Sequence, residues 1–383
     1  MNVNIIKRWV FWAHLVTGLV AGLFVFCMSF TGVLLTYERQ IIELSEIQYA
    51  VEPDAIARRI STDEVVDILH QLHPNEHHIF IRWVNKEGAA IPAWSGKNNY
   101  LLHPYSGEVM RKGEGATAEF FHQVTNLHRY LLLAGDSRAI GKNITAYANL
   151  VFLFLLLSGL YLWLPKRFNL TAFKHAFWLP KRYQNLQHRH RQWHLVFGIW
   201  CLPPLFVIAL TATLFHFTWA NKALYGAFGE SVPQRETHQT PANLQTDTVL
   251  YESLFQSAVD HANSNNYADW HSMWLEIGEE ENEARFYIDK SIGHRQELAY
   301  SLYFDTRSGN ISKVLRKSDW SRGGQAWGTA RFLHTGEYFG VIGQTIAGLV
   351  SLMACILVYT GILLAWRRLI TAPFKRKLAA ENA

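Results

Sequence analysis

The stretches AHLVTGLVAGLFVF (residues 13–26) and WHLVFGIWCLPPLFVI (residues 193–208) decide the fold of this chain. Each places a histidine, His14 or His194, just inside a long apolar run. Two further apolar runs end in LSGLYLW (157–163) and YTGILLAW (359–366), and a Leu-His pair containing His128 or His334 precedes each. Ionisable side chains in or beside a bilayer are costly and mark functional sites. The pattern predicts membrane helices that carry histidines in a repeated arrangement.

Four segments are long and apolar enough to span a bilayer, at about residues 9–37, 144–164, 195–219 and 340–366. Half of the 383 residues are hydrophobic, and the rest supply sizeable polar regions between the spans. The first span follows Lys7 and Arg8, and no small-residue cleavage site follows it, so we expect a retained anchor. We therefore expect an integral membrane α-helical protein with four spans.

The basic residues set the expected topology, because short basic loops stay on the cytoplasmic side. The 165–193 connection has no acid and seven cations: Lys166, Arg167, Lys174, Lys181, Arg182, Arg189 and Arg191. The tail adds Arg367, Arg368, Lys375, Arg376 and Lys377. Both termini and the connection are thus predicted inside, and the slightly acidic loops 38–143 and 220–339 outside. The net charge of +5 then reflects topology and membrane lipid contact, and no nucleic-acid partner is expected.

The predicted organisation alternates spans with water-facing parts. It comprises the N-terminus with the first span (1–37), an exterior domain (38–143), a span (144–164), the basic loop (165–193), a span (194–219), a second exterior domain (220–339), a span (340–366) and the tail (367–383). Each exterior loop is predicted to be a small α+β domain. The expected helices are 63–72 and 248–262, and the expected strands are 78–84, 91–96, 99–104, 272–278, 284–289 and 297–305.

The two halves of the chain repeat one pattern. His14-Leu-Val-Thr-Gly18 matches His194-Leu-Val-Phe-Gly198, residues 100–112 match 302–313, Leu127-His128 matches Leu333-His334, and Ser158-Gly159 matches Thr360-Gly361. A parallel repeat has its axis along the membrane normal, so equivalent residues face each other. The copies differ where Thr211-Ala-Thr213 replaces Phe30-Thr-Gly32, and where Pro203-Pro204 is expected to interrupt the third span.

The repeat axis predicts that His14 faces His194 near the inner membrane surface and that His128 faces His334 near the outer one. A lone interfacial histidine is more often a hydrogen-bonded or snorkelling side chain. Four in register favour two bis-histidine haem sites, whose saturated iron suits electron transfer. His216 is an alternative outer ligand, and His122 is a weaker one. Gly18, Gly22 and Gly198 suit either a macrocycle between helices or close helix packing.

The remaining features concern how such sites would work. Haem propionates need cations, and the candidates are Arg8, Arg189 and Arg191 inside and Arg129, Arg138 and Arg331 outside, although each also serves as a surface or topology charge. The sequence has no C-x-x-C-H motif, so the haems would be of type b, and no nucleotide-binding motif, so the donor would be separate. A cytoplasmic flavoprotein, a ferredoxin or membrane quinol is expected. Trp320, Trp327 and Arg322 are candidates for the exterior acceptor surface.

These motifs together resemble the PepSY-associated transmembrane family. Members share an H-x-x-x-G first span, an exterior PepSY module with a D/H-P/T-x-S/T-G-E/N turn, an L-H motif and an S/T-G-L-x-x-W exit. Within the family, the chain is similar to inner-membrane ferric-siderophore reductases of the ferrioxamine type. The resemblance implies a bacterial inner-membrane oxidoreductase that carries two b haems and reduces periplasmic ferric hydroxamate siderophores.

Two alternatives remain open at the level of sequence. One is a di-haem electron-transfer subunit that serves another periplasmic acceptor. The other is a non-catalytic regulator that binds peptides through its PepSY modules. The histidine quartet discriminates between them, because a regulator does not need it.

Overall fold

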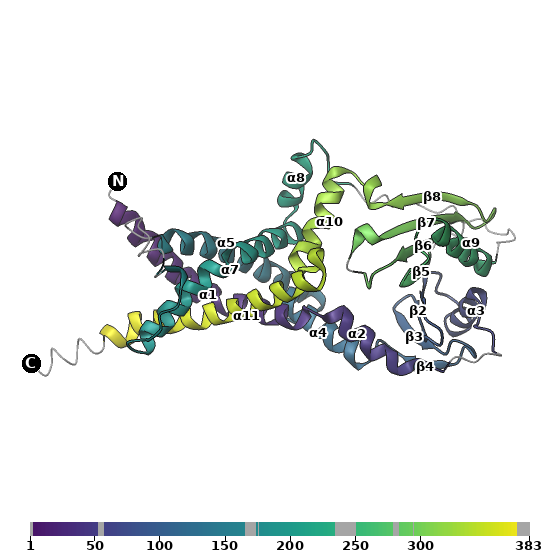
Figure 1. The fold of residues 1–383 in the computed structure, drawn as a ribbon, viewed down its shortest axis with the longest axis horizontal. Coiled ribbons are helices and arrows are strands. Elements are labelled where there is room, and N and C mark those ends of the chain that lie inside the picture. Colours follow the sequence, from purple (N-terminus) through teal and green to yellow (C-terminus); the bar gives the residue numbers. More distant parts are fainter. Residues whose placement is uncertain are drawn as a thin grey trace, which may run out of the picture. The chain divides into compact units, whose positions relative to one another are not determined.

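A computed structural model describes residues 3–52, 57–164, 174, 176–233, 250–278, 283–293 and 295–373. The chain forms two compact units (Figure 1). The helical unit comprises Met1–Thr36, His122–Leu224 and Thr329–Ala383, and the sheet unit comprises Tyr37–Phe121 and Tyr225–Gly328. The predicted basic residues Lys166, Arg167, Lys375, Arg376 and Lys377 lie outside the described residues.

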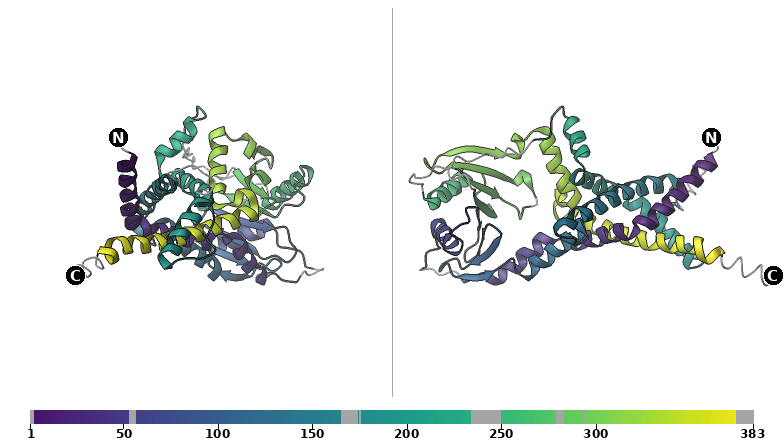
Figure 2. Two further views of the ribbon diagram at one scale, coloured as in Figure 1. Left: turned by 60° about the vertical axis from the view of Figure 1, so that its left-hand side comes forward. Right: turned by 180° about the vertical axis from the view of Figure 1, so that it is seen from behind.

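Four long helices build the helical unit: α1 (Val3–Leu35), α5 (Arg138–Trp163), α7 (Leu186–His216) and α11 (Gly340–Trp366). Helices α1 and α7 each pack against both α5 and α11, so the four run side by side as a bundle (Figure 2). Each coincides over most of its length with a segment long and apolar enough to cross a membrane. The prediction of a multi-pass membrane protein with four helical spans is confirmed.

Helix α7 continues through Pro203 and Pro204, so the predicted interruption of the third span is wrong. Proline removes a backbone hydrogen bond, but neighbouring helices can accommodate this inside a membrane bundle. Helices α5 and α7 also begin earlier than expected, at Arg138 and Leu186. Their first turns are polar, so the hydropathy of the sequence did not reveal that they are helical.

The two Leu-His pairs lie on separate helices, α4 (Ala116–Tyr130) and α10 (Arg322–Thr335), and not at the start of the spans. Close backbone approaches hold the end of each against the next long helix. A Cβ atom on Gly141 of α5 would lie 2.0 Å from the Tyr130 carbonyl oxygen. One on Gly343 of α11 would lie 2.2 Å from the Gly336 carbonyl oxygen. Both turns therefore require glycine on the long helix.

The sheet unit contains one eight-stranded sheet. The segment between α1 and α5 supplies α3 (Thr62–Leu72), β1 (Ile79–Val84), β2 (Ile91–Ser95), β3 (Asn98–Leu102) and β4 (Val109–Lys112). The segment between α7 and α11 supplies α9 (Tyr251–Ser264), β5 (Ser272–Ile277), β6 (Glu283–Asp289), β7 (Ala299–Asp305) and β8 (Ile311–Arg316). The strand order is β4-β3-β2-β1-β5-β6-β7-β8, and every neighbouring pair is antiparallel.

The expectation of two separate exterior domains is therefore corrected. Strand β1 pairs with β5 along its whole length, from Ile79 opposite Ile277 to Val84 opposite Ser272. These are the first strands of their loops, and each would otherwise expose an unpaired edge. Pairing the two edges satisfies both and merges the halves into one sheet. Residues 248–249 of the second predicted helix lie outside the described residues.

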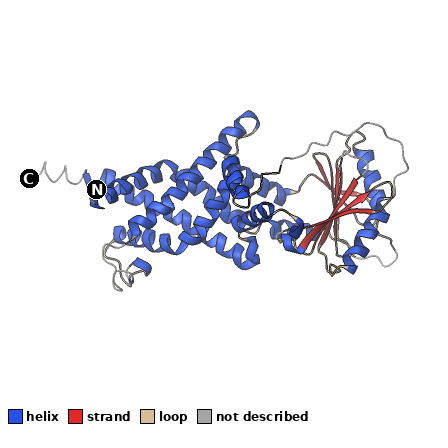
Figure 3. Ribbon diagram, turned by 90° about the horizontal axis from the view of Figure 1, so that it is seen from above, coloured by secondary structure: helices blue, strands red, loops and turns tan. Residues whose placement is uncertain are grey.

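Helices α3 and α9 cover one face of this sheet (Figure 3). Alternate strand residues such as Ile79, Ile81 and Phe286 are fully buried beneath Leu69 and Ala258 of the two helices. This alternation follows the two-residue period of a strand. The single core explains how the sheet unit folds without disulfides, since all three cysteines are free and lie on the long helices.

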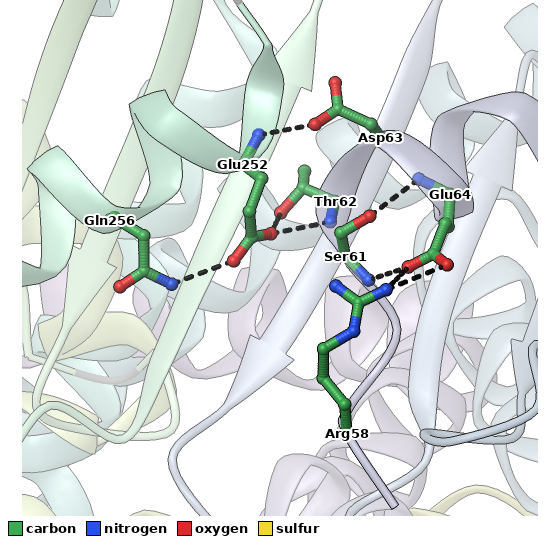
Figure 4. Close-up of polar contacts among 7 residues, drawn as sticks. All are labelled: Arg58, Ser61, Thr62, Asp63, Glu64, Glu252 and Gln256. Carbon is green, nitrogen blue, oxygen red and sulfur yellow. Dashed lines mark hydrogen bonds and ion pairs between the residues drawn. The ribbon is translucent and has the colours of Figure 1, made fainter.

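Each of the two covering helices caps the other (Figure 4). The Asp63 carboxylate of α3 accepts hydrogen bonds from the backbone nitrogens of Tyr251 and Glu252, at 2.8 and 3.0 Å. In return, the Glu252 carboxylate accepts from the Thr62 backbone nitrogen and hydroxyl, at 2.7 and 2.8 Å. First-turn amides lack partners within their own helix, so the exchange satisfies both helix starts.

Short elements complete the chain. These are α2 (Glu38–Glu46), α8 (Thr218–Gly226), the 3₁₀ turns η1 (Ile47–Tyr49), η2 (Gly135–Ser137), η3 (Gln296–Leu298), η4 (Lys317–Asp319) and η5 (Glu337–Phe339), and the π-helical turn η6 (Arg367–Thr371).

Candidate functional site

The rings of His14 on α1 and His194 on α7 face each other inside the helical bundle. Their centroids are 6.5 Å apart, and the ring planes are nearly perpendicular, at 89°. The two residues are 180 positions apart in the chain, so only the packing of the bundle brings them together. We call them the inner pair.

Hydrogen bonds fix the orientation of both inner rings through Nδ1. His14 Nδ1 is 2.8 Å from Ser158 Oγ, and His194 Nδ1 is 3.0 Å from Thr360 Oγ1 and 3.1 Å from the Leu357 carbonyl oxygen. Each hydroxyl already donates to the carbonyl four residues earlier, at 2.6 Å for Ser158 and 2.8 Å for Thr360. The hydroxyls therefore accept from Nδ1–H, and this tautomer leaves the lone pair on Nε2.

A glycine follows each of these hydroxyl residues and makes room for the imidazole. A Cβ atom on Gly159 would lie 3.4 Å from His14 Cε1, and one on Gly361 would lie 3.3 Å from His194 Cε1. The contact at Gly361 is tighter than ordinary van der Waals packing, and the one at Gly159 lies at its lower limit. The Ser-Gly and Thr-Gly motifs therefore have two functions, to orient the ring through the hydroxyl and to admit it beside the backbone.

A cavity of about 780 Å³ surrounds the inner pair. Its walls are mostly apolar and include all three glycines that the sequence had suggested, Gly18, Gly22 and Gly198. The charged residues that line it are cations only: Lys7, Arg8 and Arg368. The cavity can therefore accept a flat apolar group that carries negative charge at one edge.

Two arginines of the cavity, Arg8 and Arg368, have no acidic partner within the described part of the chain. The Arg368 guanidinium lies 4.8 Å from the Phe11 ring centroid and 5.6 Å from that of Trp12. Lys7 is already engaged, since its Nζ donates to the Leu164 carbonyl oxygen at 3.1 Å and caps the end of α5. Arg8 and Arg368 are thus the two cations available to an anionic ligand.

A second pair, the outer pair, joins His128 on α4 and His334 on α10. Their ring centroids are 6.4 Å apart, with an interplanar angle of 65°. His128 Nδ1 is 2.8 Å from Thr31 Oγ1, whose hydroxyl donates to the Cys27 carbonyl oxygen at 2.7 Å. His334 Nδ1 donates to the Ile208 carbonyl oxygen at 2.9 Å. Again the proton lies on Nδ1 and the lone pair on Nε2.

The outer imidazoles are neutral. Burial, with smaller contributions from the neighbouring His334, His216 and Arg129, lowers the pKa of His128 to about 3. Burial also lowers the pKa of His334. A metal binds only the neutral ring, so both outer rings have the protonation state that ligation requires.

The two pairs lie at different depths in the bundle. His14 and Thr31, which marks the outer pair, are 17 residues apart on α1, or about 26 Å at 1.5 Å per residue. His194 and Ile208 are 14 residues apart on α7, or about 21 Å. Both separations cover most of the roughly 30 Å thickness of the hydrocarbon layer.

The spacing within each pair fits one shared metal. A metal–imidazole bond is about 2.0–2.1 Å long, so two nitrogens on opposite sides of one ion place ring centroids about 6 Å apart. Among the described residues, no group of three or more His, Cys, Asp or Glu could hold a metal. A metal in either pair would therefore need further ligands besides these side chains.

The other predicted site residues lie elsewhere. His216 ends α7, and its buried Nδ1 has no hydrogen-bond partner. The Arg138 guanidinium lies 4.1 Å from the Tyr130 ring, that of Arg331 lies 5.7 Å from Phe332, and that of Arg189 lies 5.3 Å from Trp193. Their roles toward propionates remain predictions. Trp320, Trp327 and Arg322 belong to the sheet unit, and their place at an acceptor surface also remains a prediction.

Sequence reasoning missed the residues that support the histidines. Ser158 and Thr360 were noted only as matching motifs, and Arg368 only as a topology charge. The signal for the hydroxyls was present, since a Ser or Thr directly before a glycine recurs in the second and fourth spans. The signal for Arg368 was hidden, because its place beside Phe11 depends on the packing of α1 against the end of α11.

Comparison with known proteins agrees with this architecture. A search of curated proteins found no significant match. The family described as PepSY-associated TM region matches residues 11–368, from before His14 to the last cation of the cavity. The match thus covers nearly the whole chain and includes both histidine pairs. The chain belongs to the PepSY-associated TM region family.

Proposed function

We propose that this membrane protein holds two b-type haems, one on each histidine pair, and conducts electrons outward to a periplasmic ferric hydroxamate siderophore. The observation that carries the proposal is the recurrence of one arrangement at two depths. In both pairs the centroids are about 6.5 Å apart. In all four rings the proton is on Nδ1, and Nε2 is left for a metal.

The inner cavity supports haem over a simple metal ion. Its volume, apolar walls and glycines suit a flat macrocycle, and Arg8 and Arg368 suit two carboxylates at its edge. The chain itself thus provides a complement to each part of the cofactor.

When bound, haem supplies a one-electron carrier that needs no proton transfer. Each histidine pair would hold one haem, and the Nδ1 hydrogen bonds would keep the imidazole rings fixed. A hydroxamate holds ferric iron through hard oxygen donors, and reduction to the softer ferrous ion weakens this grip. Release of iron therefore requires an electron at the exterior side and no acid, base or nucleophile from the protein.

The proposal places the protein in a bacterial inner membrane with both termini in the cytoplasm. The basic loop supports this orientation through Lys181, Arg182, Arg189 and Arg191. The same charges would attract an acidic flavoprotein or ferredoxin as electron donor, and membrane quinol is the other candidate.

The first experiment counts the haems. Protein purified from haem-replete cells is examined by dithionite difference spectra and pyridine haemochrome quantification, with two b haems per chain expected. His14→Ala or His194→Ala should remove one, and His128→Ala or His334→Ala the other. His190→Ala is the matched control, since it lies one turn from His194 on the same helix. A colourless preparation, or any of the four variants that retains both haems, would contradict the assignment.

The second experiment tests the acceptor. Dithionite-reduced protein, freed of excess reductant, is mixed anaerobically with ferrioxamine while a chelator traps ferrous iron. Reoxidation should be faster than in buffer, and trapped ferrous iron should match the electrons lost. Reoxidation by cupric ion but not by ferrioxamine would instead assign the protein to another periplasmic acceptor and leave the two haem sites intact.

A further inference from the structure

A second cavity, of about 480 Å³, lies within the sheet unit. The loop between β1 and β2 forms one wall through Lys86, Glu87 and Gly88. Arg59 and Trp83 form another, and Pro104 and Tyr105 close the cavity beyond β3. It is separate from both histidine pairs, and nothing in the proposed electron transfer uses it. Its volume is in the range of small-molecule sites.

Arg59 is the main polar group of this cavity. Its guanidinium carbon lies 3.9 Å from the Trp83 ring centroid and 4.8 Å from that of Phe255. No hydrogen bond or ion pair joins it to another residue in the described ranges. The aromatic contacts hold the guanidinium in place through its face. They leave its N–H donors, which lie at the edge of the plane, without an acceptor.

Neighbouring acids do not supply that acceptor. Glu64 pairs with the adjacent, exposed Arg58 at 3.1 Å. Glu252 already binds Thr62 through one carboxylate oxygen and Gln256 through the other. Burial lowers the pKa of Arg59, and Glu252 only partly opposes this. Arg59 is thus a half-buried cation whose fork of donors has no protein partner in the described ranges.

We propose that this cavity binds the carboxylate of a small organic acid, free or at the C-terminus of a peptide, through the guanidinium of Arg59. A planar fork matches a carboxylate in two parallel hydrogen bonds. The carbon surfaces of Pro104 and Tyr105 suit the organic part of such a ligand. Glu87 on the wall disfavours a phosphate dianion. Together, the carboxylate and the dianion would carry more negative charge than Arg59 and Lys86 offset.

The test is isothermal titration calorimetry on the full chain in detergent. The probes are succinate, an N-acetylated dialanine with a free carboxylate, the same peptide amidated, and inorganic phosphate. Saturable binding of succinate or of the free-acid peptide is expected, and the tighter of the two identifies the source of the carboxylate. Arg59→Gln should weaken that binding by about tenfold or more. Arg58→Gln, one residue away, is the matched control and should leave it unchanged.

A further variant keeps the test valid if Arg59→Gln is poorly folded. Arg59→Lys keeps the charge but loses the fork, and it should weaken binding while the haem spectrum is retained. Three results would overturn the proposal: no saturable binding of either acid, equal binding of the amidated peptide, or tighter binding of phosphate. None of these results bears on the haem sites, so this proposal can fail while the proposed function stands, and the reverse.

Discussion

The Nδ1 atom of His14 on α1 lies 2.8 Å from the hydroxyl oxygen of Ser158 on α5. The same relationship recurs between His194 on α7 and Thr360 on α11, at 3.0 Å. A hydroxyl from a neighbouring helix thus selects the tautomer of each inner imidazole and fixes its rotation. Groups that support a ligand in this way affect affinity almost as much as the ligand itself.

Replacing Ser158 with alanine should therefore weaken haem binding at the inner pair without abolishing it. We expect an affinity loss of about 10- to 100-fold, measured by titrating haem into the apoprotein. Ser158→Thr keeps the hydroxyl and should behave like the wild type. Equal affinities for Ser158→Ala and wild type would show that the hydroxyl does not support the ligand.

A methyl group at Gly159 or Gly361 should displace the adjacent imidazole. The added carbon would lie 3.4 or 3.3 Å from Cε1 of His14 or His194, so the ring must shift by a few tenths of an ångström. We expect each alanine variant to lose or broaden the inner haem spectrum and to leave the outer one unchanged. Gly226→Ala is the control, since its Cβ atom would meet nothing within 4 Å. A normal inner spectrum in both variants would mean that the site accommodates the methyl group.

The sequence could predict the long helices and the histidine quartet because both depend on local patterns. An apolar run of sufficient length identifies a span, and a repeated His-x-x-x-Gly motif identifies equivalent positions. The repeat also predicts which histidines face each other. The distances within the two pairs follow from that symmetry and needed no knowledge of the individual side-chain contacts.

The merged sheet could not be predicted in the same way. Strands β1 and β5 are recognisable from their alternation, but nothing in either segment states that its partner lies in the other loop. Pairing across 190 residues depends on which edges remain free after each loop has folded. The continuity of α7 through Pro203 and Pro204 is another effect of packing, since the surrounding helices compensate for what proline removes.

Neutralising Arg368 should lower haem retention at the inner pair only. Its guanidinium lines the cavity beside Phe11 and Trp12, and no acid there competes for it. Arg368→Gln is expected to reduce inner haem content on purification, because a propionate loses a charged partner. Arg367→Gln is the matched control, since Arg367 does not line the cavity. If both variants lose haem equally, the effect is one of general charge near the membrane and not of the cavity.

The exchange of caps between α3 and α9 predicts a reciprocal pattern of protection (Figure 4). Asp63→Asn should speed amide exchange at the start of α9, because its carboxylate binds the backbone of Tyr251 and Glu252. Glu252→Gln should do the same at the start of α3, where the Thr62 amide loses its charged acceptor. Each change should cost about 1 kcal/mol of local stability, which hydrogen exchange with mass spectrometry can measure. Asp67→Asn, an exposed position on α3, is the control.

The double variant tests whether the two caps act together. Asp63 at the start of α3 caps α9, and Glu252 at the start of α9 caps α3. Loss of one cap should therefore also loosen the position of the side chain that forms the other. The combined effect is therefore expected to be smaller than the sum of the single effects, as contacting residues commonly show. Strictly additive effects of the two substitutions would mean that burial on the sheet holds each helix start independently. The exchanged caps would then only satisfy the first-turn amides.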